Sequence, residues 1–404
     1  MLYEPSRHEP LSGDPWNTEA VRAAVREIAL DAQHARAGDG SWPLHPLDEE
    51  GDMPRGGYKG LYLGRAGVLW SLATLQRAGA IELPASIDLR AAIEQAEADY
   101  RADPDSGQVV PSYFLGAVGI QLVRWRLTDD AAMADRLHDA VRSNLDNPTN
   151  EALWGASGTM LAAWHLWRAT GQARWRVLFL DNVESLWRTW QFDAPSGCWL
   201  WTQDMYGSQV QYLGAGHGFA GNVSPLLLGA SLLDEARREA LYERCEATLV
   251  AMARRDGDAV NWPPGTWTAR PGAPALLMQW CHGAPGIVTA LAHFPPQRSA
   301  AVDALLIAAG HAIWQAGPLA KGPGLCHGTA GNGLAFLVLH RRTGDATWLA
   351  RARAFAMHAV LQRDRALQQY GQGRYTLWTG DLGLALVLQQ CLDGTPGVPS
   401  LDNF

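Results

Sequence analysis

Two nearly matching motifs contain the residues of this sequence that are best suited to chemistry. Cys281 and His282 are adjacent and followed by glycine, and so are Cys326 and His327. Only five cysteines occur among the 404 residues. Because thiolates are soft ligands and imidazole also suits zinc, two cysteines with a histidine predict a zinc site.

Three protein ligands would leave the fourth tetrahedral position of zinc open, which is the arrangement of catalytic sites. Such a site would bind an incoming thiol, deprotonate it and make it a nucleophile at neutral pH. Two alternatives remain at this point. The cysteines can be buried core residues, or His282 and His327 can both join them in a closed, structural site.

A glycine pattern indicates how the chain positions these motifs. Seven Gly-x-x-Gly elements occur, and an apolar run follows each one. One such element is weak evidence, but seven in succession indicate a repeat. Their first glycines are Gly64, Gly116, Gly155, Gly218, Gly283, Gly328 and Gly380.

The spacing of the elements, about 50 residues, suits two helices with their connections. The run after each glycine pair is apolar on nearly all sides, which is typical of a buried helix. Charged amphipathic segments follow several of these runs. We therefore expect seven helical hairpins, each with an inner and an outer helix, closed into an all-α, α/α toroid. The toroid would span residues 58–404, after an N-terminal lead-in segment of residues 1–57.

Equivalent positions of a closed ring lie at one height around the same rim. The two positions before the first glycine hold metal-competent or titratable residues in repeats four to six, which are neighbours. Cys281, Cys326 and the histidines are therefore expected to converge at one end of the ring. His217 occupies the position of His327 in repeat four, and we expect it to transfer a proton during the reaction.

Composition excludes several classes of function. The formal net charge is −8 and no basic stretch alternates with aromatic residues, so we expect no nucleic-acid partner. No run of about 18 apolar residues predicts a membrane-spanning helix. The first residues lack the apolar core of a signal peptide, and the odd number of cysteines argues against a disulfide framework. We therefore expect a cytoplasmic protein.

Three sequence motifs resemble the signature of the lanthionine synthetase C-like family, which includes bacterial lanthipeptide cyclases and eukaryotic LanC-like proteins. They are QWCHGAPG, GLCHGTAGNG and the upstream GAGHGFAGN. The resemblance extends from Tyr58 to Leu392 and implies an α/α toroid. It also implies one Zn2+ per chain, held by Cys281, Cys326 and His327.

The resemblance implies a reaction as well. A thiol activated by zinc adds to the β-carbon of dehydroalanine or dehydrobutyrine in a peptide or protein, and His217 serves as the acid/base residue. The thiol is a cysteine of the same peptide in the cyclases. In the LanC-like branch it is glutathione, which would then be a co-substrate here.

Several positions distinguish the two branches. His282 resembles the LanC-like branch, as does Lys321, because a lysine helps to hold glutathione there. Leu277 stands where the cyclases often have arginine. The balance favours the LanC-like branch, although the reaction class is common to both.

Two further residues are candidates by resemblance alone. Glu151 takes the place of an acidic residue near the active site of the cyclases, and the alternative for it is a solvated glutamate at a helix start. Arg270 follows the motif NWPPG at 261–265, which resembles the LanC-like branch. We treat Arg270 as a candidate substrate contact.

Other classes of function compete with this interpretation. A carbohydrate-active α/α barrel would need paired carboxylates in its cavity, whereas the rim here has cysteine and histidine. A prenyltransferase-like barrel also binds a thiol on zinc, but its ligands include a carboxylate. A non-catalytic, zinc-containing member that binds peptides or serves as a scaffold is the remaining alternative.

Overall fold

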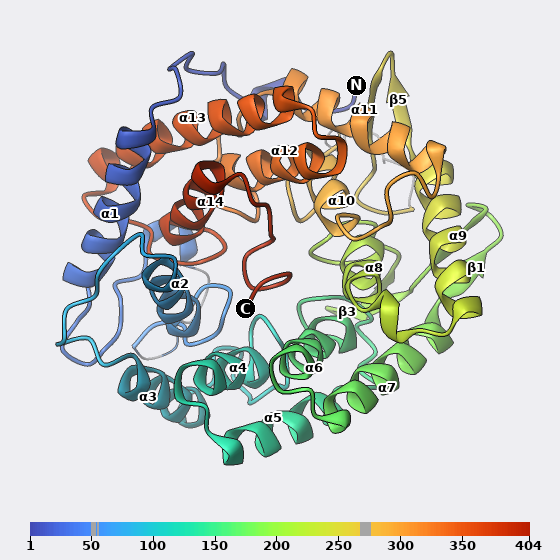
Figure 1. Ribbon diagram of the computed structural model, residues 1–404. Helices are drawn as coiled ribbons and strands as arrows, with labels where there is room; N and C mark the ends of the chain where they lie inside the picture. The colour runs from blue at the N-terminus through green and yellow to red at the C-terminus, as the bar shows by residue number, and fades with distance from the viewer. Residues whose placement is uncertain (50–53, 55, 267–275) are drawn as a thin grey trace.

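The computed structural model describes residues 1–49, 54, 56–266 and 276–404 of the chain. Two concentric layers of helices form a closed ring, as the sequence predicts (Figure 1). Among the described residues, no helix combines the length and the apolar character that crossing a membrane requires.

Each inner helix begins directly after the first glycine of a Gly-x-x-Gly element, and its residues are mostly buried. Apolar residues on all sides suit this layer, because its helices contact the outer layer, their neighbours and the ring centre. The inner helices are α2 (Arg65–Arg77), α4 (Ala117–Thr128), α6 (Ala156–Thr170), α8 (Phe219–Leu228), α10 (Ala284–Ala290), α12 (Thr329–Thr343) and α14 (Asp381–Asp393).

Six outer helices each follow an inner helix along the chain, and α1 supplies the seventh. In Figure 1, α1 lies outside α14, which closes the outer layer with a segment from the N-terminal part of the sequence. The division at residue 57 remains a prediction. The outer helices are α1 (Thr18–His34), α3 (Leu89–Ala102), α5 (Ala131–Ser143), α7 (Ala173–Thr189), α9 (Glu235–Met252), α11 (Ala300–Ala316) and α13 (Ala346–Tyr370).

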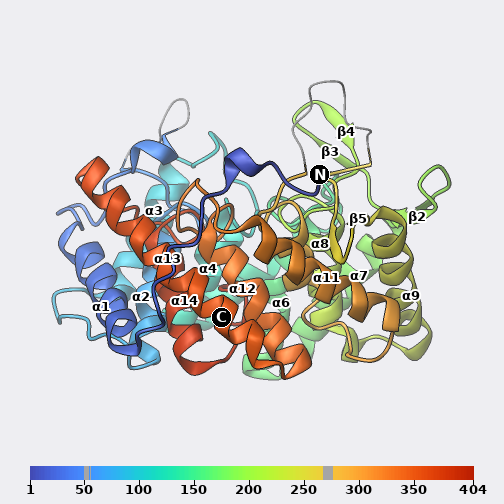
Figure 2. The same cartoon turned by 90° about the horizontal axis from the view of Figure 1, so that it is seen from above.

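Within the described residues, three short antiparallel hairpins interrupt the helical pattern, and the sequence does not predict them. Two lie between α7 and α8, and the third follows α9. Figure 2 shows β3 and β4 on the same face of the ring as the N-terminus. The strands are β1 (Gln191–Asp193), β2 (Cys198–Leu200), β3 (Gln203–Met205), β4 (Ser208–Val210), β5 (Arg254–Asp256) and β6 (Ala259–Asn261).

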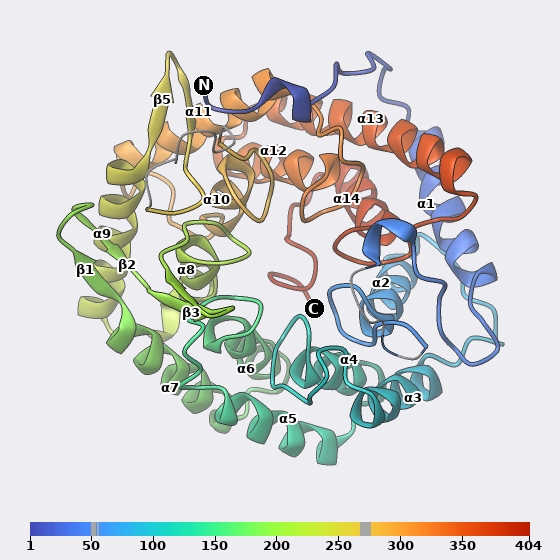
Figure 3. The same cartoon turned by 180° about the vertical axis from the view of Figure 1, so that it is seen from behind.

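The C-terminal residues lie in the centre of the ring (Figure 3). The Tyr113 hydroxyl donates a hydrogen bond to the Ser400 carbonyl. The ring of Phe404 lies 5.5 Å from that of Trp70, centroid to centroid. The C-terminal residues therefore pack against the inner side of the ring.

The second glycine of each element allows the loop before an inner helix to fold back against that helix. A Cβ atom at Gly331 would overlap the carbonyl oxygen of Leu325, six residues earlier, and Gly286 has the same relation to Trp280. Only glycine permits so close an approach of backbone to backbone. The repeated motif thus holds each rim loop against the helix that follows it.

Gly331→Ala is expected to destabilise the fold by about 1–3 kcal/mol, because the added methyl group has no space. Gly333→Ala in the same helix is a matched control, since its Cβ would meet the Phe355 Cβ at an ordinary 3.4 Å. There alanine is expected to stabilise the helix by about 0.5–1 kcal/mol. Thermal unfolding of both variants checks the sign, and equal effects would contradict the close-packing role of Gly331.

The rim loops are joined by backbone hydrogen bonds in a continuous series. In each bond the N–H of one rim residue donates to the carbonyl of its counterpart in the adjacent repeat, at 2.8–3.3 Å. The series confirms that these positions lie at one height. In order, its members are Gly216, Cys281, Cys326, Trp378, Tyr62 and Phe114.

Candidate active site

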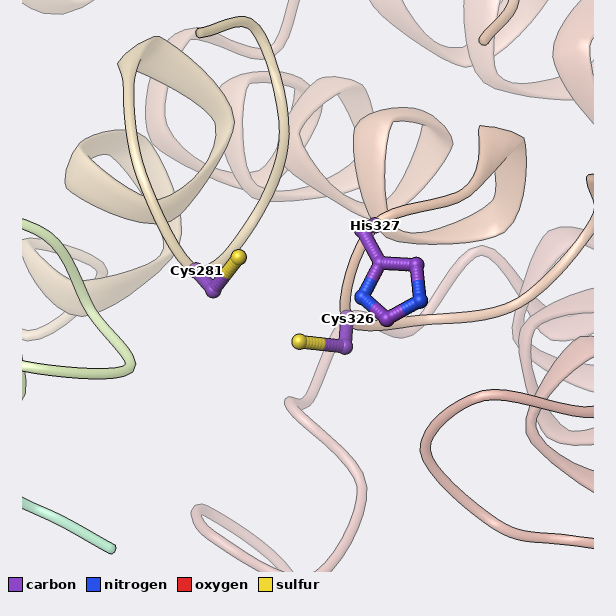
Figure 4. A group of neighbouring side chains, drawn as sticks. All are labelled: Cys281, Cys326 and His327. Carbon is purple, nitrogen blue, oxygen red and sulfur yellow. The ribbon is translucent and has the colours of Figure 1, made fainter. Parts of the chain in front are cut away.

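The structure brings together Cys281, Cys326 and His327 at the rim. Their ligand atoms, two sulfurs and one imidazole nitrogen, all lie within 4.8 Å of one another. Figure 4 shows the two sulfur atoms and the His327 ring facing a common space between the loops before α10 and α12. The cysteine residues are only 9% and 5% exposed.

This donor set fits zinc. Zinc bonds of about 2.0–2.3 Å place tetrahedral ligand atoms about 3.5–4 Å apart, so donors within 4.8 Å need only small movements. In the described part of the chain, His282 does not belong to this cluster. The geometry thus favours the predicted three-ligand site over the closed site with both histidines, and the assignment of the ligands remains a prediction.

The two thiols at the site affect each other's ionisation. A hydrogen bond from the Cys326 thiol lowers the pKa of Cys281 well below its usual value; burial opposes this effect, and a hydrogen bond from His327 adds to it. The same contact and burial raise the pKa of Cys326. Metal binding to both sulfurs would release any proton that either thiol carries.

His217 lies beside this cluster and is paired with a carboxylate. Its Nδ1 lies 3.0 Å from Oε2 of Glu151, and the side chains are 25% and 0% exposed, respectively. Burial alone would lower the pKa of His217, but the hydrogen bond and charge of Glu151, with the charge of Cys281, raise it overall. Because a carboxylate only accepts, Nδ1 carries the proton of this contact, and Nε2 is the ring nitrogen that takes no part in it.

Glu151 is fixed by its own loop as well as by His217. The backbone N–H groups of Leu153 and Trp154 donate to its carboxylate at 2.9 and 2.6 Å. Because the side chain is fully buried, the interpretation of Glu151 as a solvated residue is wrong. The carboxylate orients His217 instead of facing solvent.

His282 and Tyr212 surround His217 with aromatic rings. The His282 ring lies 5.9 Å from that of His217 and 5.5 Å from that of Tyr212, centroid to centroid. Burial lowers the pKa of His282, although the charge of Cys281 opposes the shift. Its Nδ1 is buried without a hydrogen-bond partner.

The structure describes only one of the two residues that are predicted to contact glutathione or substrate. Lys321 is exposed on the connection between α11 and α12, five residues before Cys326. Its positive charge lies near enough to Cys326 to lower the pKa of that thiol slightly, against the larger opposing effects. Arg270 falls outside the described residues. The role predicted for each residue remains a prediction.

Two residues near the sulfur atoms were not predicted. Gln279 donates a hydrogen bond from Nε2 to the Cys281 sulfur at 2.9 Å. Tyr62 belongs to the same rim series as both cysteines, and burial, with the charges of Cys326 and Cys281, raises its pKa well above the usual value. The position of Tyr62 in the repeat is a signal that could have identified it.

Comparisons with known proteins agree with these motifs. Residues 56–402 match the profile of the family described as "Lanthionine synthetase C-like protein". The chain is 35% identical over 151 residues to "Glutathione S-transferase LANCL1" of Danio rerio, covering 37% of this chain and 35% of the relative. It is 36% identical over 182 residues to "LanC-like protein GCL1" of Arabidopsis thaliana, covering 43% and 39%. These alignments thus span less than half the length of either relative.

The solved structure named "Nisin cyclase" has the same fold. It superposes with a TM-score of 0.63 at 17% sequence identity, covering 93% of this chain and 94% of that one. At this identity the likeness concerns the fold alone. The family match, by contrast, includes the seven glycine elements and both Cys-His motifs. The chain therefore belongs to the lanthionine synthetase C-like protein family.

Proposed function

We propose that this protein catalyses the zinc-dependent addition of a thiol to dehydroalanine or dehydrobutyrine residues of a peptide or protein, which gives a thioether. The observation that carries the proposal is the convergence of two sulfurs and an imidazole nitrogen within 4.8 Å. The buried His217–Glu151 pair beside them supports it. Membership of the family agrees with the reaction class.

In this proposal, Cys281, Cys326 and His327 hold one zinc ion. Bound there, zinc supplies positive charge that favours the deprotonated form of a thiol in the open position. The buried loops keep both cysteine ligands away from bulk water. Because the site requires reduced cysteines, and all five are free, a cytoplasmic location remains part of the proposal.

His217 provides the proton that completes the addition. The thiol sulfur bonds to the β-carbon, the carbon–carbon double bond becomes an enolate, and the α-carbon then takes a proton. Overall, one S–H adds across one double bond, so no oxidant or reductant is needed. Glu151 holds the imidazole in one orientation and stabilises its protonated form.

The pH dependence of turnover should report on this pair. Since His217 donates as an imidazolium, the rate is expected to fall as pH rises through its raised pKa. Glu151→Gln removes the charge that raises this pKa, so the falling limb should move to lower pH. Rates measured across pH for both proteins check the shift, and superimposable profiles would exclude Glu151 as the residue that tunes His217.

Glutathione is the thiol donor that we favour. His282 and Lys321 match the LanC-like branch, and Leu277 replaces the arginine of the cyclases. The exposed ammonium group of Lys321 is suited to a glutathione carboxylate. One similar protein carries the name glutathione S-transferase, which agrees with this choice.

A competition assay tests the donor and the reaction together. The zinc-loaded protein is incubated with a peptide that contains dehydrobutyrine and one internal cysteine, with and without glutathione. Mass spectrometry distinguishes the glutathione adduct from the ring, which has the mass of the starting peptide but no free thiol. The adduct is expected. If only the ring forms, the thiol donor is the peptide cysteine and not glutathione. If no product forms, the result favours the alternative of a non-catalytic scaffold.

A further inference from the structure

The side chain of Gln279 is buried against a predicted metal ligand. The residue is 7% exposed, and its Nε2 donates a hydrogen bond to the Cys281 sulfur at 2.9 Å. Its backbone N–H also donates to the His282 carbonyl at 3.2 Å. The amide therefore belongs to the same tight loop as the sulfur that it contacts.

Arg7 determines which end of this amide faces the sulfur. One guanidinium nitrogen of Arg7 donates to Oε1 of Gln279 at 3.4 Å. Because a guanidinium has donors only, it selects the amide oxygen and leaves the NH2 group for the sulfur. The opposite orientation would place an oxygen against the sulfur and an NH2 group against Arg7.

The N-terminal segment that presents Arg7 is attached to the connection leading to Cys326. The Ala320 N–H donates to the Arg7 carbonyl, and the Glu9 N–H donates to the Pro318 carbonyl, both at 3.0 Å. Farther along, Glu9 is bonded to the buried His358 of α13. The backbone of Arg7 is therefore bonded to the connection before Cys326, while its side chain contacts Gln279 in the loop before α10.

We propose that Gln279, oriented by Arg7, is a positioning residue for the Cys281 sulfur in the metal site. Its hydrogen bond fixes the direction of the sulfur and offsets part of the negative charge that two thiolates concentrate in a buried space. This role rests on the zinc site of the proposed function. It concerns how tightly the metal is held rather than which substrate reacts.

Gln279→Met tests the role, because methionine keeps the length of the side chain but lacks the N–H donor. The zinc Kd, from competition with a chromophoric chelator, is expected to rise by about 10–100-fold. In the cobalt-substituted protein, the sulfur-to-metal absorption band should move to longer wavelength, since the sulfur lone pairs lose a stabilising donor. Gln279→Glu also lacks the donor and should shift the zinc Kd and the cobalt absorption band in the same directions. It is the test variant if Gln279→Met fails to fold.

A double-variant cycle separates Arg7 from general effects of the N-terminal segment. As a single substitution, Arg7→Met should weaken zinc binding. Added to Gln279→Met, it should have no further effect, because Arg7 acts only through the Gln279 amide. Tyr3→Phe is the matched control. It removes the 3.2 Å hydrogen bond from this segment to the Gln315 carbonyl and should leave zinc binding unchanged.

Wild-type zinc affinity and an unmoved cobalt band in both Gln279 variants would overturn this inference while leaving the proposed function intact. Additive effects of Arg7→Met and Gln279→Met would overturn the orienting role of Arg7. A wild-type protein that binds neither zinc nor cobalt would remove the proposed function itself.

Discussion

Cys326→Ala is expected to abolish zinc binding and thioether formation together. The variant leaves one sulfur and one imidazole at the site, and two donors do not hold zinc against competing chelators. The backbone N–H of residue 326 still donates to the Trp378 carbonyl, so the rim series survives the change. Elemental mass spectrometry of the purified variant, alongside the adduct assay, measures both losses.

Cys245→Ala is the matched control for this experiment. Cys245 is likewise buried, but it lies in the outer helix α9, and its burial raises the pKa of its thiol. Its loss is expected to cost some stability and no zinc. One zinc per chain in Cys326→Ala would show that the ligands are assigned wrongly, whereas zinc loss in both variants would indicate a general effect of removing buried cysteine.

His217→Ala is expected to retain zinc and to lose about 10²–10⁴-fold in rate, the usual contribution of one acid/base group. His217 is bonded to Glu151 rather than to the cysteine cluster, so its removal leaves the three metal donors in place. Zinc content and the rate of adduct formation are measured on the same preparation.

His340→Ala provides the comparison, because this imidazole lies near the far end of α12 and contacts the Asp345 carbonyl instead of the site. It should keep both zinc and rate. If His217→Ala turned over at the wild-type rate, His217 would be a packing residue. If it lost zinc, His217 would instead support the metal.

The glycine pattern predicted the inner helices because it has a direct physical cause. At Gly328 and Gly380 the helix begins where the sequence places it, since a loop can fold onto its own helix only at glycine. The position of α1 in the outer layer was not predicted. Its partner, α14, lies at the other end of the sequence, and no local pattern reports so distant a contact.

The candidate site was predictable where it follows from the repeat. Cys281 and Cys326 are equivalent positions of neighbouring repeats, so the closed ring brings them together. The contact of Gln279 depends on the direction of one side chain, which no repeat determines. Strands of three residues, such as β3, are too short to show an alternating pattern.

Zinc titration of the metal-free protein, in the presence of glutathione and a peptide with dehydrobutyrine, tests zinc-dependent thiol addition most directly. Thioether product is followed by mass spectrometry as zinc is added. We predict no enzyme-dependent product without zinc, and a rate that rises until one zinc is bound per chain. Equal product formation by the metal-free protein, or none at full zinc occupancy, would contradict zinc-dependent thiol addition.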